Sequence, residues 1–248
     1  MAPEELLDAF AAAAGEVGRA VGAVSGPRRR ARTRRAGQYE IDVAADAAAL
    51  RVLRGLPVGI VSEESGRSGP AGSEVTVVVD PVDGSTNAAR EIPYWATSIC
   101  ALDADGPLAA LVVNQATGVT FTAVRGNGAR RDGTELRASD VTKVDDAVVA
   151  LSSLPDRILP WKQFRSLGSC ALALCDVAAG SIDAYVDAGR WHAPWDYLGG
   201  WLACREAGAT VVDVAEEPLA VTDPLARRQL LAAATPALLE ALRPAVVR

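Results

Sequence analysis

Two aspartates, Asp80 and Asp83, follow a run of valines in the stretch VVVDPVDGSTN, which covers residues 77–87. Acids do not belong at the end of a buried strand without a reason, because an unpaired carboxylate is costly to bury. A rigid Pro-Val pair separates the two carboxylates, and the free carbonyl of Val82 can join them around one cation. Oxygen donors of this kind favour a hard cation such as Mg2+.

The residues after this pair add a candidate anion site. Gly84 and Ser85 offer backbone N–H groups at a predicted helix start, where an anion is stabilised. An ordinary turn would also use Asp and Gly, but it would not need a second carboxylate. A cation site beside an anion site suits a phosphate ester that is bound through a metal ion.

Further acids occupy the ends of predicted elements. Asp46 lies on a predicted helix face four residues after Asp42, Glu63 and Glu64 end a predicted strand, and Asp196 starts a predicted helix. Taken singly, they have ordinary explanations: a solvent-facing helix residue, an exposed strand end and a helix N-cap. Together, side chains at strand ends and helix starts can converge on one pocket. Several carboxylates in one pocket would need metal ions to stay ionised.

The spacing of the two aspartates separates different kinds of chemistry. Haloacid-dehalogenase-like phosphatases carry Asp-x-Asp-Gly-Thr, in which the first Asp is the nucleophile, and nucleotide-sugar glycosyltransferases use Asp-x-Asp for Mn2+. Here two residues separate Asp80 from Asp83, one more than in those motifs, and this would misplace the second carboxylate. The sequence therefore favours a metal-activated water over an aspartyl-phosphate enzyme.

The composition narrows the function classes. The chain has 248 residues and a net charge of -6, which argues against a nucleic-acid partner because such proteins need a positive footprint. The sequence has no apolar run long enough for a membrane span, and the N-terminus lacks the basic start of a signal peptide.

The four cysteines have no CxxC spacing. We expect buried thiols in a reducing cytoplasm, with a disulfide between distant positions as the alternative.

Two features admit more than one interpretation. The segment PRRRARTRR carries six arginines between Arg28 and Arg35. It could bind an anion or a nucleic acid, but in an acidic protein a solvated connector is the simpler interpretation. The only histidine, His192, excludes HExxH and multi-histidine metal sites. It could lie on a substrate-side loop, or it could be a structural or exposed residue.

The periodicity of apolar residues predicts two halves. Helices are expected at residues 3–23 and 38–56, strands at 57–64 and 74–80, and an antiparallel meander at 94–125 followed by a turn-rich piece at 126–133. A second unit alternates strands and helices: strand 147–153, helix 169–180, strand 182–187, helix 196–208, strands 210–214 and 230–234, and a final helix from residue 236. We predict an α+β half at residues 1–140 and an α/β half at residues 141–248.

The string DPVDGSTN resembles the metal-binding signature of the inositol monophosphatase family of Mg2+-dependent, lithium-sensitive phosphatases. VSEESG is similar to the family's Glu-Glu element, and IDVAADAAAL is similar to its helix with a catalytic aspartate. AVRGNGARRDGTELRAS, FRSLGSCALALCDVAAGSIDAYVD and PWDYLGGWLACREAGA resemble three later elements, in the family's order. The resemblance covers roughly residues 38–235. It implies a layered αβαβα sandwich of the inositol monophosphatase and fructose-1,6-bisphosphatase type.

The resemblance also implies a role for individual positions. The implied metal ligands are Glu63, Asp80, the Val82 carbonyl, Asp83 and Asp196. The implied catalytic residues are Asp46, Glu63 and Ser85, with Asp46 and Ser85 beside the attacking water. The N–H groups of Gly84 and Ser85 would hold the phosphate, and the implied substrate contacts are Cys170 and Asp187.

From the resemblance we expect a phosphomonoesterase that uses two or three Mg2+ ions, with Mn2+ able to substitute. The expected substrate is a small polyol phosphate such as inositol 1-phosphate. Same-fold alternatives act on histidinol phosphate, fructose 1,6-bisphosphate, NADP or 3'-phosphoadenosine nucleotides, and a catalytically silent metal-binding regulatory protein is an alternative of another class. We also expect a cytoplasmic homodimer whose partner is a small phosphorylated metabolite rather than nucleic acid or a membrane. The short segment LSSLPDRILPW and the missing Phe after Asn87 depart from the family pattern and leave the substrate open.

Overall fold

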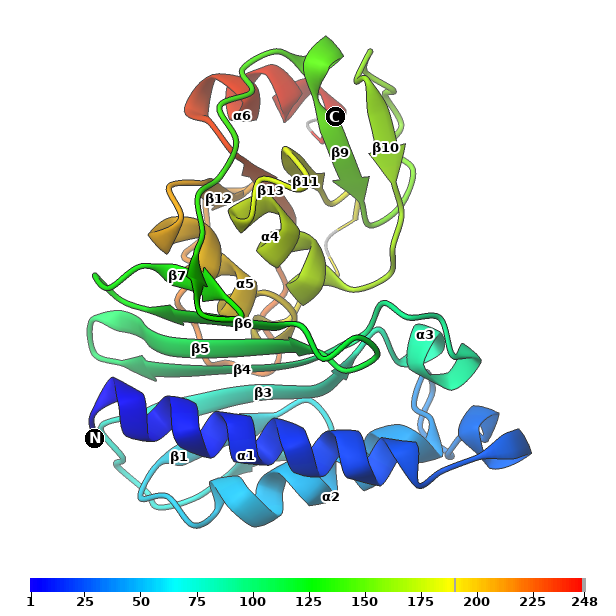
Figure 1. Cartoon of the computed structure of the whole chain (residues 1–248), viewed down its shortest axis with the longest axis vertical. Helices are drawn as coiled ribbons and strands as arrows, with labels where there is room; N and C mark the ends of the chain where they lie inside the picture. The colour runs from blue at the N-terminus through cyan, green and yellow to red at the C-terminus, as the bar shows by residue number, and fades with distance from the viewer. Residues whose placement is uncertain (190, 247–248) are drawn as a thin grey trace.

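Helices α1 (Pro3–Gly22) and α2 (Glu40–Leu53) form the first layer of the computed structural model, which describes residues 1–189 and 191–246 (Figure 1). Pro3 begins α1, and the buried residues Leu6, Phe10, Ala13 and Val17 recur along it at helical spacing. This apolar stripe packs on α2 and on the first sheet. The helix expected at residues 3–23 is therefore confirmed.

The second layer is an eight-stranded sheet in the order β2-β1-β3-β4-β5-β6-β7-β8. Strand β1 pairs with β3 in parallel, and every other pairing in this sheet is antiparallel. The meander expected at residues 94–125 is the central run β4, β5 and β6. The strand bounds are β1 (Gly59–Ser62), β2 (Gly66–Ser68), β3 (Thr76–Asp83), β4 (Ala96–Asp103), β5 (Gly106–Asn114), β6 (Thr120–Val124), β7 (Ala129–Arg131) and β8 (Thr134–Glu135).

Helices α4 (Cys170–Ala178) and α5 (Pro194–Glu206) form the middle layer, between the two sheets (Figure 1). They pack against each other and against strands of both sheets. The largest cluster of buried apolar residues joins them to β4 and β5 on one side and to β11 on the other. These two helices therefore carry their residues into the space between the sheets.

The remaining layers are a five-stranded sheet in the order β10-β9-β11-β13-β12 and helix α6 (Pro236–Leu242) on its outer face (Figure 1). Pairs β9–β10 and β9–β11 are parallel, whereas β13 pairs antiparallel with β11 and β12. The bounds are β9 (Val148–Leu151), β10 (Gln163–Arg165), β11 (Ala184–Val186), β12 (Thr210–Asp213) and β13 (Leu230–Ala233). The order of layers is αβαβα, as the resemblance implies.

Several short elements were absent from the sequence prediction. They are β2, β7, β8 and β10 and the 3-10 turns η1 (Gly26–Arg30), η2 (Val144–Asp146) and η3 (Arg243–Ala245). The helix start predicted at Gly84 and Ser85 is confirmed, and it begins helix α3 (Ser85–Arg90). The turn-rich piece at 126–133 contains β7, so it is partly a strand, which corrects the prediction. The predicted boundary near residue 140 falls between β8 and η2, and the division into halves stays a prediction. Every helix within the described ranges is too short or too polar to span a bilayer.

Candidate active site

Strand β3 carries Asp80 and Asp83 toward the same site, and a β-bulge is the reason. In a regular strand, residues three apart point to opposite faces of the sheet. Asp80 pairs with Ser98 of β4, but Asp83 pairs with Ala96, so three steps along β3 oppose two steps along β4. The extra residue changes the alternation of side chains, and the two carboxylates can then approach each other.

Hydrogen bonds fix the backbone between the two aspartates. The N–H of Val82 donates to Asp80 Oδ1 at 2.9 Å, and the hydroxyl of Ser85 donates to the Val82 carbonyl at 3.0 Å. Gly84 follows with a φ of 90°, and a Cβ there would lie 2.9 Å from the carbonyl oxygen of Gly168. Both the backbone conformation and the lack of space therefore require glycine between β3 and α3.

Asp196 reaches these acids on helix α5, which approaches the first sheet and α4 closely at two glycines. A Cβ at Gly199 would lie 2.9 Å from Ser98 Oγ, and a Cβ at Gly200 would lie 2.5 Å from Leu174 Cβ. A larger residue at either position would push the helix away from its neighbours. The two glycines thus set the depth of Asp196, which lies in the first turn of α5.

Asp80, Asp83 and Asp196 form what we call the acidic cluster. Each offers a carboxylate oxygen, and these oxygens all lie within 4.8 Å of one another. Asp80 is 1% exposed and Asp83 is 8% exposed. A set of carboxylate oxygens at this spacing fits a hard divalent cation, whose charge would offset their mutual repulsion.

Burial and repulsion raise the pKa values of Asp80, Asp83 and the neighbouring Glu63. Burial, followed by the charges of Glu63 and Asp83, raises the pKa of Asp80 well above its usual range. Burial and the charge of Asp196 raise the pKa of Asp83 to about 6. The same two causes raise the pKa of Glu63, whose side chain contacts Asp80, to about 8. Glu63 is therefore electrostatically part of the acidic cluster.

Asp83 also joins β3 to helix α4. Its Oδ2 accepts a hydrogen bond from the Ser169 hydroxyl at 2.5 Å and another from the Ala171 N–H at 2.8 Å. Ser169 is the N-cap of α4, so the start of this helix is bound directly to the acidic cluster. Cys170, the first residue of α4, is consequently held beside Asp83.

A cavity of about 360 Å³ opens beside the acidic cluster. Asp83 and Asp196 contribute to its lining, together with Cys170 from α4, Tyr185 from β11 and His192 from the loop before α5. A concave site that contains buried acids with raised pKa values is typical of an active site.

Comparison of the sequence with known proteins identifies the family to which the chain belongs. The sequence model of the inositol monophosphatase family matches residues 5–248. The chain belongs to the inositol monophosphatase family. The acidic cluster fits the metal dependence that this family leads one to expect.

Individual members of the family differ in how much of the chain they match. A fructose-1,6-bisphosphatase/inositol-1-monophosphatase of Archaeoglobus fulgidus is 36% identical over 183 residues, which are 72% of this chain and 71% of that protein. Nus factor SuhB of Escherichia coli strain K12 is 34% identical over 169 residues, and the chain spans only 62% of its length. A hypothetical protein from Pyrococcus horikoshii with similarities to inositol-1 monophosphatase has a solved structure of the same fold, with a TM-score of 0.89, complete coverage of both chains and 24% identity.

The two residues that the family resemblance places beside the attacking water have separate partners. Asp46 Oδ1 accepts a hydrogen bond from the Ser62 hydroxyl at 2.5 Å. The side chain of Ser85 contacts Asp42, which sequence analysis gave no role. Asp42 is 2% exposed, its Oδ1 has no hydrogen-bond partner among the described residues, and burial raises its pKa to about 6. The position of Asp42 four residues before Asp46 was the only signal in the sequence.

The predicted substrate contacts Cys170 and Asp187 differ in position. Cys170 lines the cavity, whereas Asp187 is 0% exposed and is absent from its lining. Asp187 Oδ1 accepts hydrogen bonds from the Ser152 hydroxyl at 2.6 Å and from the Gly189 N–H at 3.0 Å. All four cysteines are buried and free, as expected.

Several members of the arginine run make specific contacts, Arg29 and Arg35 among them, so the segment is more than a solvated connector. Arg29 donates to the carbonyls of Val21 and Val24 at the end of α1 and to that of Ala88 in α3. Arg35 forms an ion pair with Glu64 at 3.1 Å and also donates to backbone carbonyls of the Glu-Glu element, at 3.2 Å. The run thereby links the first two helices to segments beside the acidic cluster.

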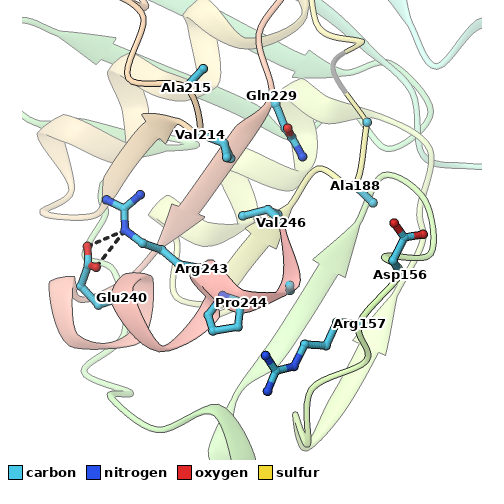
Figure 2. Close-up of a pocket in the computed structure, with 12 residues that line it drawn as sticks. Asp156, Arg157, Ala188, Val214, Ala215, Gln229, Glu240, Arg243, Pro244 and Val246 are labelled. Atoms are coloured by element: carbon cyan, nitrogen blue, oxygen red, sulfur yellow. Dashed lines mark hydrogen bonds and ion pairs between the residues drawn. The ribbon is translucent and has the colours of Figure 1, made fainter. Parts of the chain in front are cut away.

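A larger cavity, of about 1210 Å³, lies apart from the acidic cluster near the C-terminal end of the described chain (Figure 2). Glu240 and Arg243 form an ion pair at its edge, and Arg157 approaches from the opposite side (Figure 2). None of its described lining residues belongs to the acidic cluster. The chemistry expected of the family therefore belongs to the smaller cavity.

Proposed function

We propose that the protein is a Mg2+-dependent phosphomonoesterase that hydrolyses the monophosphate of a small, uncharged polyol, with inositol 1-phosphate as the first candidate. The observation that carries this proposal is the convergence of Asp80, Asp83 and Asp196 beside a cavity of about 360 Å³, which Asp83 and Asp196 line. The acids supply a cation site, and the cavity offers room for the alcohol part of a small ester.

The metal ligands would be Glu63, Asp80, the Val82 carbonyl, Asp83 and Asp196. Bound Mg2+ would supply charge neutralisation at the phosphate and a lower pKa for a water molecule. We propose two or three bound metal ions, as the family resemblance implies. We also propose that these ions are Mg2+ rather than Mn2+. The donor set favours Mg2+, because oxygen ligands without histidine or cysteine suit a hard cation.

The protein's own groups would position the reactants. The N–H groups of Gly84 and Ser85, at the start of α3, would donate to the phosphate oxygens. The Ser85 hydroxyl and the Asp46 carboxylate would orient the attacking water, and the Asp46 carboxylate would receive its proton. Ser85 is held for this task by its hydrogen bond to the Val82 carbonyl, at 3.0 Å.

The chemistry of the cavity favours an uncharged alcohol. Its described lining contains no lysine or arginine, which a second phosphate would need, and its only acids are Asp83 and Asp196 of the acidic cluster. The ammonium group of histidinol would therefore find no separate carboxylate there. Ser152, Ser153 and Tyr185 instead offer hydroxyl groups, which can hydrogen-bond to a polyol.

Fructose 1,6-bisphosphate is the second candidate, because the relative from Archaeoglobus fulgidus is named as a phosphatase of both substrates. The test is phosphate release from inositol 1-phosphate, fructose 1,6-bisphosphate, histidinol phosphate, NADP and 3'-phosphoadenosine 5'-phosphate, each with Mg2+ and with EDTA. We expect the highest kcat/KM for inositol 1-phosphate and no release with EDTA. Absence of Mg2+-dependent release from every ester would overturn the proposal and favour a silent metal-binding protein.

We also propose that the protein acts as a homodimer in the cytoplasm. The dimer follows from the family resemblance, and four free, buried cysteines fit a reducing compartment. Light scattering of the purified chain tests the dimer, and a monomeric mass at working concentration would exclude it.

A further inference from the structure

We infer that His192 is a positioning residue for Asp196, and that Tyr185 and Asp187 act on Asp196 through its imidazole ring. The inference rests on the proposed function, in which Asp196 is a metal ligand. It gives a role to the only histidine of the chain, which the family resemblance leaves without one.

The backbone of His192 is fixed before α5 begins. His192 and Arg228 form an isolated antiparallel bridge, in which the His192 N–H donates to the Arg228 carbonyl at 3.2 Å and the Arg228 N–H donates back at 2.8 Å. The Arg228 side chain is held in turn by the Pro218 carbonyl and by an ion pair with Glu217 at 2.8 Å. The ring of His192 therefore projects from a fixed point of the loop.

The two nitrogens of the His192 ring face different groups: one faces a carboxylate of the acidic cluster, and the other faces a hydroxyl and a buried carboxylate. Nδ1 lies 3.5 Å from Asp196 Oδ2, and Nε2 lies 2.7 Å from the Tyr185 hydroxyl. Nε2 also lies 3.9 Å from Asp187 Oδ2. The imidazole thus stands between a carboxylate of the acidic cluster and a carboxylate buried behind the cavity.

Asp196 is held through one of its oxygens. Oδ2 accepts a hydrogen bond from the Ala193 N–H at 2.7 Å, and the same oxygen faces His192 Nδ1. One backbone donor and the imidazole of the same loop therefore lie against this oxygen before any cation binds. A partner that fixes the orientation of a metal ligand strengthens metal binding.

Asp187 is suited to hold the ring rather than a substrate. It is 0% exposed, and its Oδ1 is already bonded to Ser152 and Gly189. Its Oδ2 has no hydrogen-bond partner among the described residues and faces His192. A buried, unpartnered carboxylate oxygen needs an explanation, and the neighbouring imidazole provides one.

Two substitutions of His192 separate positioning from simple space filling. In His192→Asn, the side-chain amide can take the place of Nδ1 and keep a donor toward Asp196. In His192→Gln, the longer side chain reaches the place of Nε2 and loses the donor toward Asp196. We expect His192→Gln to weaken Mn2+ binding by about 10-fold or more and His192→Asn to weaken it far less.

The readout is the dissociation constant of Mn2+, measured by calorimetry and by the paramagnetic resonance signal of the free ion, with the full chain. Equal Mn2+ affinity in His192→Gln and in the wild type would overturn the inference. Equal weakening in the Gln and Asn variants would also overturn it, because the ring would then only fill space. Leu225→Ala, at an 83% exposed residue outside the cavity lining, is the control and should keep the wild-type affinity.

The isosteric changes Tyr185→Phe and Asp187→Asn keep the inference testable if His192→Gln fails to fold. Each should weaken Mn2+ binding when His192 is present, and Asp187→Asn should add nothing in a His192→Gln background. Wild-type affinity in both isosteric variants would contradict the inference. A wild-type chain that neither binds Mn2+ nor releases phosphate would instead contradict the proposed function.

Discussion

Asp80 and Asp83 bring their carboxylates to one site although they lie three positions apart along β3. The bulge opposite Ser98 and Ala96 makes this possible, and Asp83 then serves two purposes. It offers an oxygen to the acidic cluster and accepts the hydrogen bonds that begin α4. The metal site and the start of a central helix are therefore built on the same carboxyl group.

Asp83→Asn should separate these two purposes. The amide oxygen can still accept the bonds from Ser169 and Ala171, but it carries no charge for a cation. We expect kcat/KM with Mg2+ to fall by at least about 100-fold, because loss of a direct ligand should exceed the loss of an outer partner. Melting followed by circular dichroism should show a folded protein.

Asp213→Asn is the matched control for this variant. Asp213 is 2% exposed, accepts backbone N–H bonds from Ala215, Glu217 and Gln229, and is not a member of the acidic cluster. The change should lower stability without altering the dependence of activity on Mg2+. Wild-type turnover in Asp83→Asn would remove Asp83 from the metal site.

The sequence predicted the acids of the site better than their geometry. Asp80, Asp83 and Asp196 were recognisable from residue type, spacing and a family signature, and the structure brings them together. The bulge in β3 could not be predicted, because it depends on the register with β4 rather than on any residue of β3 alone. The contact between Asp42 and Ser85 depends likewise on how α2 packs against α3.

The elements that escaped prediction are short or lie at sheet edges. Strands β2 and β10 are three residues long, each at the edge of a sheet, and β10 is exposed along its length. Such strands lack the apolar alternation on which a prediction depends. The long helices and the central strands, which have an apolar periodicity or a continuous apolar run, were all predicted.

Gly200→Ala tests how closely α5 must approach α4. The added Cβ would lie 2.5 Å from Leu174 Cβ and 3.0 Å from the Ala171 carbonyl oxygen, so the helices must separate. We expect a loss of stability of about 1–3 kcal/mol, as for overpacking elsewhere. Affinity for Mg2+ should fall as well, because Asp196 moves with α5.

Gly15→Ala is the control, since Gly15 lies within α1 and an added Cβ there would meet only the Arg19 guanidinium, at 3.9 Å. Helix propensity alone predicts a gain of about 0.5–1 kcal/mol for this change. Chemical unfolding of the two variants measures the difference. A stabilised Gly200→Ala protein would show that the approach of α5 to α4 is not limited by this residue.

Two neighbouring arginines of the run, Arg29 and Arg30, allow a test of whether the contacts of this segment stabilise the fold. Arg29 donates to three backbone carbonyls, those of Val21, Val24 and Ala88, and Arg30 is exposed. We expect Arg29→Ala to lower the free energy of unfolding by about 1–3 kcal/mol, because it leaves those carbonyls without a donor. Arg30→Ala should change stability by less than about 0.5 kcal/mol. Equal effects would favour the solvated connector that the composition suggested.

The raised pKa values predict how Mg2+ changes stability with pH. Without metal, the folded-state pKa of Asp83 is about 6 and that of Glu63 is about 8, whereas both carboxyls titrate near pH 4 when unfolded. The folded state then binds more protons than the unfolded state between about pH 4 and about pH 8. The stability that these groups contribute is fully present below about pH 4 and is lost as the pH rises through 6 and 8.

Bound Mg2+ favours the charged carboxylates, so it should remove this loss. We expect the melting temperature in EDTA to fall as the pH rises from about 5 to about 9, and the gain on adding Mg2+ to grow over the same range. Glu63→Gln removes one of the titrating groups and should flatten the curve in EDTA. A gain from Mg2+ that stays constant with pH would mean that these carboxyls are already ionised in the metal-free protein.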